Sequence, residues 1–358
     1  MAGSRRQTPL SPSVDTGHIP ARTPGPLGVN DQGDPNVTTL LGDTPLSLGI
    51  RDLGDPTLPQ FSSTDPSNQV CIDPTRNPLS IGFDAKPTAA SAVAPQPSEN
   101  IALNEAQDIA LKISTCFEGG KPMNYQALED DAFDGQGMSF GIIQWNFGQN
   151  TLGPLLKKML DANATAFKAC FGEGTDYDTL EKALKAGNKN NEMKWARDVQ
   201  NKNHDAWESA FKNVGSNDTF NKIQRDQAVG QYHPLAGAVI KELRKISASL
   251  FANIELRSYA AIFDLCVQQH GISNCLSEIK KRIKDEKPAS QLEAMKIVVG
   301  ERARKANSQW RADCLSRRMG ILTGAAYEAT ENEITAKRKN PQLSLVAGAT
   351  GAKIVSGL

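Results

Sequence analysis

The sequence predicts a mainly α-helical domain with one small β segment near its start, preceded by a proline-rich arm. From Ile101 onward, apolar residues recur at the spacing of helices. Residues 125–145 break this period, and residues 1–99 hold much of the chain's proline, with Ser, Thr, Asp and Gly between. Because such a composition buries too little apolar surface to offset its chain entropy, we expect a disordered arm over residues 1–99.

The expected domain covers residues 100–338 and begins with a helix that a glycine pair at 119–120 ends. Two short apolar runs then flank the Asp-Gly-Gln-Gly segment at 134–137, which is typical of a small hairpin or β-sheet insertion. Helical patterns follow over residues 152–160, 164–171, 177–186, 193–212, 219–246, 256–269, 273–284, 291–315 with a break, and 325–337. We expect the Gly/Ala-rich residues 339–358 to form a flexible tail.

Composition and charge exclude several classes of function. Lys plus Arg and Asp plus Glu both number 40 among 358 residues, which argues against non-specific nucleic-acid binding as the main activity. No run of about 18 apolar residues is present, so no membrane span is expected. The N-terminal sequence MAGSRRQTPLSPSV has two arginines without an apolar run behind them, so we expect no secretory signal peptide.

The histidines and cysteines do not have the spacing of a metal site. The four histidines are scattered, and no two of the six cysteines are as close as a zinc ribbon requires, so we expect no catalytic metal and no cofactor. Cysteines of this kind are most simply buried small apolar residues. Alternatively, Cys266 and Cys275 flank a short turn and could form a disulfide in an oxidising compartment.

The arm contains an internal repeat. The segment TPGPLGVNDQGDPN at 23–36 recurs 21 positions later as TPLSLGIRDLGDPT at 44–57. A duplicated linker and a docking or secretion segment that a partner orders on binding are both compatible with this pattern.

Glu118 stands at the end of the first predicted helix, directly after Phe117. The negative end of the helix dipole and apolar neighbours both disfavour its charged form, as a general acid working near neutral pH requires. The alternative is a solvated helix-terminal glutamate.

Glycoside hydrolysis requires a second carboxylate, and Glu129, Asp130, Asp131 and Asp134 are the candidates. Asp134 differs from the others because it opens a Gly-x-Gly turn, where a polymer could approach the backbone closely. Simple turn chemistry also explains an Asp-Gly pair. We interpret the three remaining carboxylates as solvated neighbours.

The combination of Glu118 with the segment that starts at Asp134 is more specific than either feature alone. A helix ending in Glu, then Asp-Gly-x-Gly-x-Ser-x-Gly-Ile-Ile starting 16 positions later, resembles the lysozyme-like superfamily and most closely its chitosanase branch. The resemblance implies a two-lobed helical domain in which Glu118 is the general acid, Asp134 activates water and Ser139 helps to hold that water. It also implies inversion, with the two carboxyl groups about 7 to 14 Å apart. Gln136 stands where the branch commonly has a basic residue.

Three later segments extend the resemblance over about residues 101–327. Residues 219–236 are similar to the family's long central helix, 258–271 to a helix behind the cleft, and 311–324 to a final arginine-rich helix. Indole faces suit sugar rings and amides suit their hydroxyls, although core packing explains a tryptophan equally well. The expected substrate-binding residues are Tyr125, Gln144, Trp145, Asp226 and Tyr232.

The expected function is cleavage of a glycan. Peptidoglycan fits better than chitosan, because a cationic polymer calls for an acidic cleft and this chain has no net charge. The arm then suggests a muramidase effector, made in the cytoplasm and delivered by a type VI-like system to the periplasm or cell wall of a target bacterium, or else a phage-type lysin. Expected partners are peptidoglycan strands, an immunity protein and, through residues 1–99, a secretion component. Alternatives are a chitosanase, a catalytically silent glycan-binding module, and an adaptor that acts through its arm.

Overall fold

The computed structural model describes residues 99–131 and 135–358. The arm with its repeat at 23–36 and 44–57 lies outside the described residues, and so does Asp134. The described residues are mainly helical with three small sheets, which confirms the predicted fold class.

Helix α1 (Leu103–Gly119) places Glu118 at its C-terminal end. The helix buries a face that includes Ala106, Ala110, Ile113 and Phe117, so the apolar spacing fixes which side meets the core. It ends where Gly120 adopts a left-handed conformation with φ of 68°, as the glycine pair predicts.

A three-stranded antiparallel sheet follows, with β2 (Leu128–Asp130), β3 (Met138–Phe140) and β4 (Trp145–Asn146) in that order. This confirms the predicted β insertion. Gly135 and Gly137 have φ of 70° and 84°, and a Cβ at Gly137 would lie 3.2 Å from Met193 Cγ. Glycine is therefore favoured at both positions by backbone conformation and at the second also by packing.

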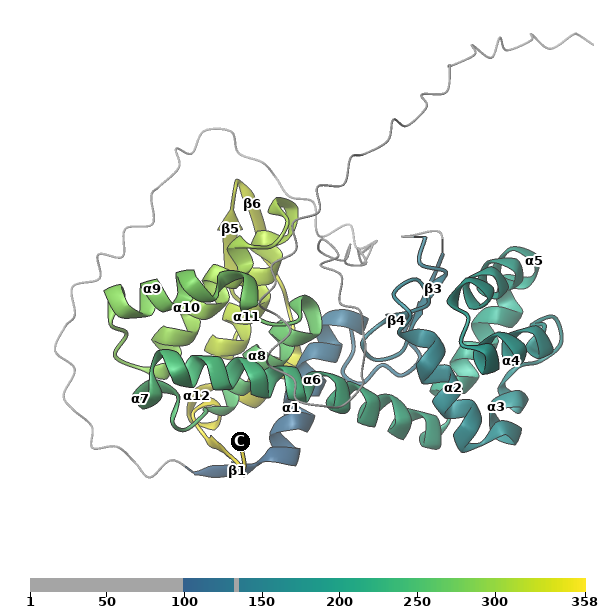
Figure 1. Cartoon of the computed structure of the whole chain (residues 1–358), viewed down its shortest axis with the longest axis horizontal. Helices are drawn as coiled ribbons and strands as arrows, with labels where there is room; N and C mark the ends of the chain where they lie inside the picture. The colour runs from purple at the N-terminus through teal and green to yellow at the C-terminus, as the bar shows by residue number, and fades with distance from the viewer. Residues whose placement is uncertain (1–98, 132–134) are drawn as a thin grey trace, which may run out of the picture. The chain divides into compact units, whose positions relative to one another are not determined.

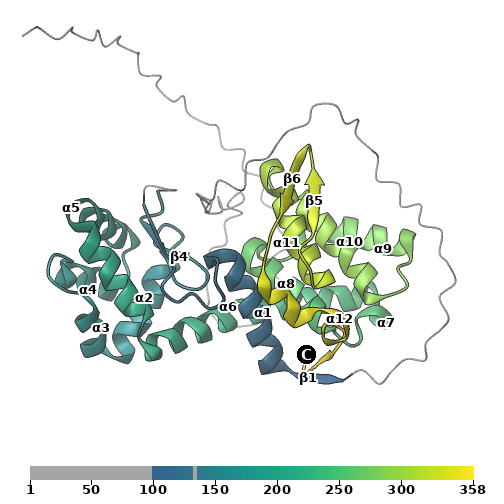
Figure 2. The same cartoon turned by 180° about the vertical axis from the view of Figure 1, so that it is seen from behind.

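Two groups of helices pack around one apolar core. The first group follows the sheet and comprises α2 (Leu152–Ala162), α3 (Ala164–Cys170), α4 (Tyr177–Ala186) and α5 (Lys189–Gly215). The second comprises α7 (Ala248–Phe251), α8 (Leu256–Gln269), η3 (Ser273–Cys275), α9 (Leu276–Glu286), α10 (Gln291–Arg304), η4 (Ser308–Trp310) and α11 (Arg311–Thr323), together with α1. The long helix α6 (Asp218–Ile246) contacts α2 and α5 in the first group and α1 and α8 in the second, and both views show it joining them (Figures 1 and 2).

The helix predicted over residues 325–337 is wrong. This segment is a hairpin of β5 (Glu328–Glu331) and β6 (Ile334–Lys337) that packs on α11 (Figure 1). Gly324 ends α11 in a left-handed conformation, and Asn332 and Glu333, with φ of 50° and 69°, form the tight turn between the strands.

The loose tail predicted over residues 339–358 is also not what the structure contains. Here the chain forms η5 (Pro341–Val346), α12 (Gly348–Gly351) and β7 (Ile354–Ser356), and β7 pairs in parallel with β1 (Asn100–Ala102). Leu343 and Val346 are buried, and Asn340 Nδ2 donates to Ile113 O at 2.9 Å. Burial of these few apolar residues against α1 outweighs the flexibility that the glycines suggest.

No helix in the described part of the chain has the length and apolar character needed to cross a bilayer. Cys266 and Cys275, which could have formed a disulfide, are both buried free thiols.

Candidate active site

Glu118 is nearly buried, with 7% of its surface exposed, and its carboxylate contacts a buried arginine. Arg317 on α11 donates through Nη2 to Glu118 Oε1 at 2.6 Å, while its guanidinium carbon lies 4.7 Å from the centre of the Phe117 ring. The contact engages one carboxylate oxygen, so it orients Glu118 at the end of α1.

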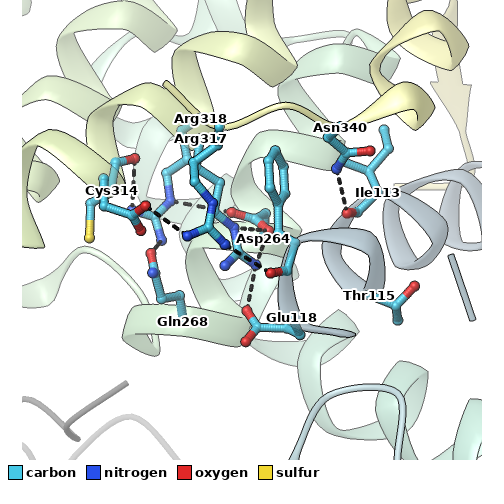
Figure 3. Close-up of polar contacts among 12 residues, drawn as sticks. Ile113, Thr115, Glu118, Asp264, Gln268, Cys314, Arg317, Arg318 and Asn340 are labelled. Carbon is cyan, nitrogen blue, oxygen red and sulfur yellow. Dashed lines mark hydrogen bonds and ion pairs between the residues drawn. The ribbon is translucent and has the colours of Figure 1, made fainter. Parts of the chain in front are cut away.

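Asp264 on α8 holds the same guanidinium from another side. Its Oδ1 accepts from Arg317 Nε at 2.9 Å and from Nη2 at 2.7 Å, and its Oδ2 lies 3.6 Å from Arg318 Nε. Arg318 Nη2 in turn donates to Gln268 Oε1. Figure 3 shows these side chains in one cluster, with Arg317 joined to both Asp264 and Glu118.

The cluster balances two carboxylates against two guanidiniums, since Glu118 and Asp264 face Arg317 and Arg318. Burial alone would lower the pKa of Arg317, but the carboxylates of Asp264 and Glu118 raise it above its ordinary value. Such a site can keep charges out of water because each charge has an opposite partner.

Tyr232 on α6 belongs to the same neighbourhood. Burial first, and then the Glu118 carboxylate, raise the pKa of its phenol, so its hydroxyl stays protonated. Gln231 Nε2 donates to this hydroxyl at 3.2 Å, and Gln231 Oε1 accepts from Trp145 Nε1 at 3.3 Å. A polar chain therefore leads from the β-sheet to the environment of Glu118.

The predicted binding residues differ in their exposure to solvent. Trp145 has 2% of its surface exposed and packs in the core, so protein covers its indole faces. Gln144, also buried, donates to Gly141 O at 3.0 Å. Asp226 is exposed and pairs with Lys222 and, at 3.4 Å, with Arg225.

Tyr125 and Ser139 lie on the β side of the site. Ser139 is buried on β3, opposite Glu129 of β2 and Asn146 of β4. Tyr125 is half-buried, and burial raises the pKa of its phenol. Gln224 on α6 fixes this side, because it donates to Tyr125 O at 3.2 Å and accepts from Ile142 N at 3.1 Å.

Asp131, expected to be a solvated neighbour, instead anchors Gly137, which lies just before β3, to helix α5. Its carboxylate oxygens accept from Arg197 of α5 at 2.7 and 3.2 Å, and one of them also accepts from the backbone N–H of Gly137. The expectation fails because α5, which is distant in sequence, brings a guanidinium to this position. The separation of Glu118 and Asp134 stays a prediction, since Asp134 lies outside the described residues.

Sequence reasoning missed Arg317, Asp264 and Arg197. Asp264 carried a signal, because it interrupts the otherwise apolar stretch YAAIFDLC, and a carboxylate there requires a buried partner. The adjacent pair Arg317 and Arg318 on α11 could have supplied that partner. Arg197 carried no comparable signal, since it lies among the alternating charges of a solvated helix face.

Within residues 99–131 and 135–358, no group of three or more His, Cys, Asp or Glu side chains is arranged to hold a metal ion.

Comparisons with known proteins find structural likeness at low sequence identity. No known family model and no curated protein matches the sequence. A mutant chitosanase from Bacillus subtilis MY002 complexed with 6 GlcN matches with a TM-score of 0.40 and 17% identity, covering 66% of this chain and 100% of that one. Native chitosanase from the same organism gives 0.38 and 18%, with the same coverage. A chitosanase complex gives 0.41 and 16%, covering 65% of this chain and 96% of that one.

Proposed function

We propose that this protein is a glycoside hydrolase that cleaves β-1,4 bonds of bacterial peptidoglycan, with Glu118 as general acid and Asp134 as general base. The observation that supports this most is the placement of Glu118, buried at the end of α1 with Oε1 engaged by Arg317 at 2.6 Å. A carboxyl group held in one orientation by a neighbour that is itself fixed by Asp264 suits directed proton transfer.

The proposed reaction is a single displacement by water. Glu118 gives a proton from Oε2 to the glycosidic oxygen, while Asp134 takes a proton from a water molecule that attacks the anomeric carbon from the opposite face. Ser139 holds that water. The bond to the leaving oxygen breaks as the bond to water forms, so the product has inverted configuration.

The charge of the site supports a neutral or N-acetylated glycan over a polycation. Asp264 of the buried cluster lies between Arg317 and Arg318, and Asp131 is balanced by Arg197. A chitosan chain, which carries an ammonium group on every residue, would gain little attraction from carboxylates that are already paired.

The experiment is digestion of peptidoglycan and, separately, of chitosan by the purified full-length protein, with products identified by mass spectrometry. We expect muropeptides with reducing-end muramic acid, and a fall in kcat of about 100- to 10,000-fold in Glu118→Gln and in Asp134→Asn. Glucosamine oligomers alone would make the protein a chitosanase. Full activity in both variants would remove the site assignment, and no product from either polymer would favour a silent binding module.

We further propose that the protein is an antibacterial effector that the arm over residues 1–99 connects to a secretion component, and that an immunity protein plugs its cleft. The repeat at 23–36 and 44–57 supports a docking role for the arm. Directing the protein to the periplasm of a sensitive strain should lyse the cells, whereas Glu118→Gln should not. Survival of cells expressing the active protein in the periplasm would count against this role.

A further inference from the structure

Arg338, the residue directly after β6, joins the last turn of α1 to α11. Its Nη2 donates to Phe117 O at 3.0 Å, and its Nη1 donates to Asp313 Oδ1 at 3.1 Å. Phe117 is among the last four residues of α1, whose carbonyl groups have no N–H partner within the helix. The guanidinium therefore supplies a donor to the backbone at the residue just before Glu118.

Helix α11 holds Arg338 by its backbone as well as by its side chain. The Arg338 N–H donates to Ser316 Oγ at 2.9 Å, and this hydroxyl donates in turn to Tyr327 O at 2.7 Å. Ser316 is buried, and the Asp313 side chain is 16% exposed. The guanidinium thus reaches α1 from a residue that is itself fixed at two points.

The same segment makes a second contact with α1, one turn earlier. Asn340 is buried, and its Nδ2 donates to Ile113 O at 2.9 Å (Figure 3). Ile113 and Phe117 are four residues apart, so they lie on one side of the helix. Residues 338–340 therefore hold the C-terminal part of α1 at two successive turns.

These contacts complement the one that Arg317 makes with Glu118. Arg317 follows Asp313 by four residues on α11 and holds the carboxylate, with Nη2 2.6 Å from Glu118 Oε1. Arg338 holds the backbone one residue before that carboxylate. Because helix ends fray, an ion pair at the tip of the Glu118 side chain does not by itself fix the main chain that carries it.

We propose that Arg338 is a positioning residue for Glu118, acting through the backbone of the last turn of α1. This inference rests on the proposed function, in which Glu118 is the general acid. A displacement of about 1 Å at a reacting group can cost about 100-fold in rate. Since the Arg338 side chain is 35% exposed, its hydrogen bonds contribute only modestly to global stability. Its main effect therefore falls on the reaction.

The test compares Arg338→Gln and Arg338→Lys in the full-length protein, with soluble peptidoglycan strands as substrate. We expect kcat to fall about 10- to 100-fold in Arg338→Gln, with KM within about twofold of the parent, because Arg338 contacts protein and not the glycan. Arg338→Lys should lose less, since it keeps the charge but cannot bridge both acceptors. Amide hydrogen exchange over residues 116–120 should become faster in Arg338→Gln. The melting temperature should fall by about 5 °C or less.

Arg244→Gln is the matched control. Arg244 on α6 is also half-buried, and it donates to two carbonyl groups at the end of another helix, α7, with Nε 3.0 Å from Phe251 O and Nη2 3.3 Å from Ala252 O. Its loss should lower the melting temperature by a similar amount. The kcat and the amide exchange at the end of α1 should stay at the parent's values.

An Arg338→Gln enzyme with the parent's kcat would overturn the inference, as would unchanged exchange at the end of α1 or an equal kcat loss in Arg244→Gln. If Arg338→Gln does not fold, Arg338→Lys is held to the same comparisons. Glu118→Gln measured in parallel separates the two proposals. If it is fully active, the proposed role of Glu118 fails; if it is inactive while Arg338→Gln turns over normally, only this inference fails.

Discussion

Two buried carboxylates, one in each group of helices, are accommodated in opposite ways. Asp264 on α8 has no exposed surface and lies between Arg317 and Arg318. Glu192 on α5 has 1% of its surface exposed and forms no ion pair among the described residues, and a Cβ at Gly153 would lie only 2.1 Å from its Oε2. Its side chain is thus packed against the first turn of α2.

The difference shows what a guanidinium does for a buried carboxylate. Asp264 exchanges the water it loses on burial for contacts with two guanidiniums. Glu192 has no such replacement, and burial raises its pKa to about 7. The region of α8 and α11 is therefore stabilised by charge pairing. The packing of Glu192 on α5 against α2 instead favours the protonated form of its carboxyl group.

Removing the charge of Asp264 should have the largest effect on stability. Asp264→Asn leaves Arg317 and Arg318 buried without a full counter-charge, so we expect the free energy of unfolding to fall by about 3–5 kcal/mol. Urea unfolding followed by circular dichroism measures this as a lower midpoint. Activity should fall as well, because Arg317 then loses the contact that fixes it beside Glu118.

Asp285→Asn on α9 is the control for this prediction. Asp285 pairs with Lys281 at the surface, where the two side chains are 53% and 78% exposed, so its midpoint should not change measurably. Equal midpoints in the Asp264 and Asp285 variants would contradict the view that the buried cluster needs its central carboxylate.

Glu192→Gln should stabilise the protein in a pH-dependent way. Below pH 4.5 the carboxyl is protonated in both the folded and the unfolded chain, whereas between pH 4.5 and about 7 only the unfolded chain loses the proton. The parent therefore loses stability across this window and stays at the lower level above it. We expect the variant to be more stable by roughly 1–3 kcal/mol at pH 8 and about equal at pH 4.

Thermal unfolding of both proteins from pH 4 to pH 8 measures the difference, with Glu208→Gln on the same helix as control. Lys212, hydrogen-bonded to Glu208 at the surface, lowers the pKa of that carboxyl, so its removal should give no gain at pH 8. A stability difference between Glu192→Gln and parent that does not vary with pH would show that Glu192 does not titrate in this range.

Local signals in the sequence were sufficient to predict most of the helices and the end of α1, because apolar spacing and a glycine pair act within one segment. The Asp-Gly-x-Gly spacing likewise predicted a β insertion beside Glu118. The charges that orient the site could not be paired from the sequence, since Glu118 and Arg317 are 199 positions apart and Asp131 and Arg197 are 66 apart. Long-range pairing depends on how helices pack, which residue patterns do not specify.

The hairpin of β5 and β6 was missed for a different reason. Its residues Glu, Ala and Lys favour helices, but the chain must turn back on α11 after Gly324, and Asn332 and Glu333 take left-handed conformations to make that turn. Tertiary packing therefore overrides the local preference for helix. Its energetic cost is the left-handed backbone conformation of Glu333.

The smallest predicted effect tests whether the left-handed conformation at Glu333 lowers the stability of the protein. Glu333→Gly creates an Asn-Gly turn, and relief of a left-handed conformation worth about 1–2 kcal/mol is partly offset by the greater freedom of glycine in the unfolded chain. We expect a net gain of roughly 0.5–1 kcal/mol, measured by thermal unfolding. Glu331→Gly makes the same change within β5, where the backbone is extended and glycine weakens the strand, so it should destabilise the protein. Shifts of the same sign in both variants would mean that loss of the glutamate side chain, and not the conformation at position 333, sets the result.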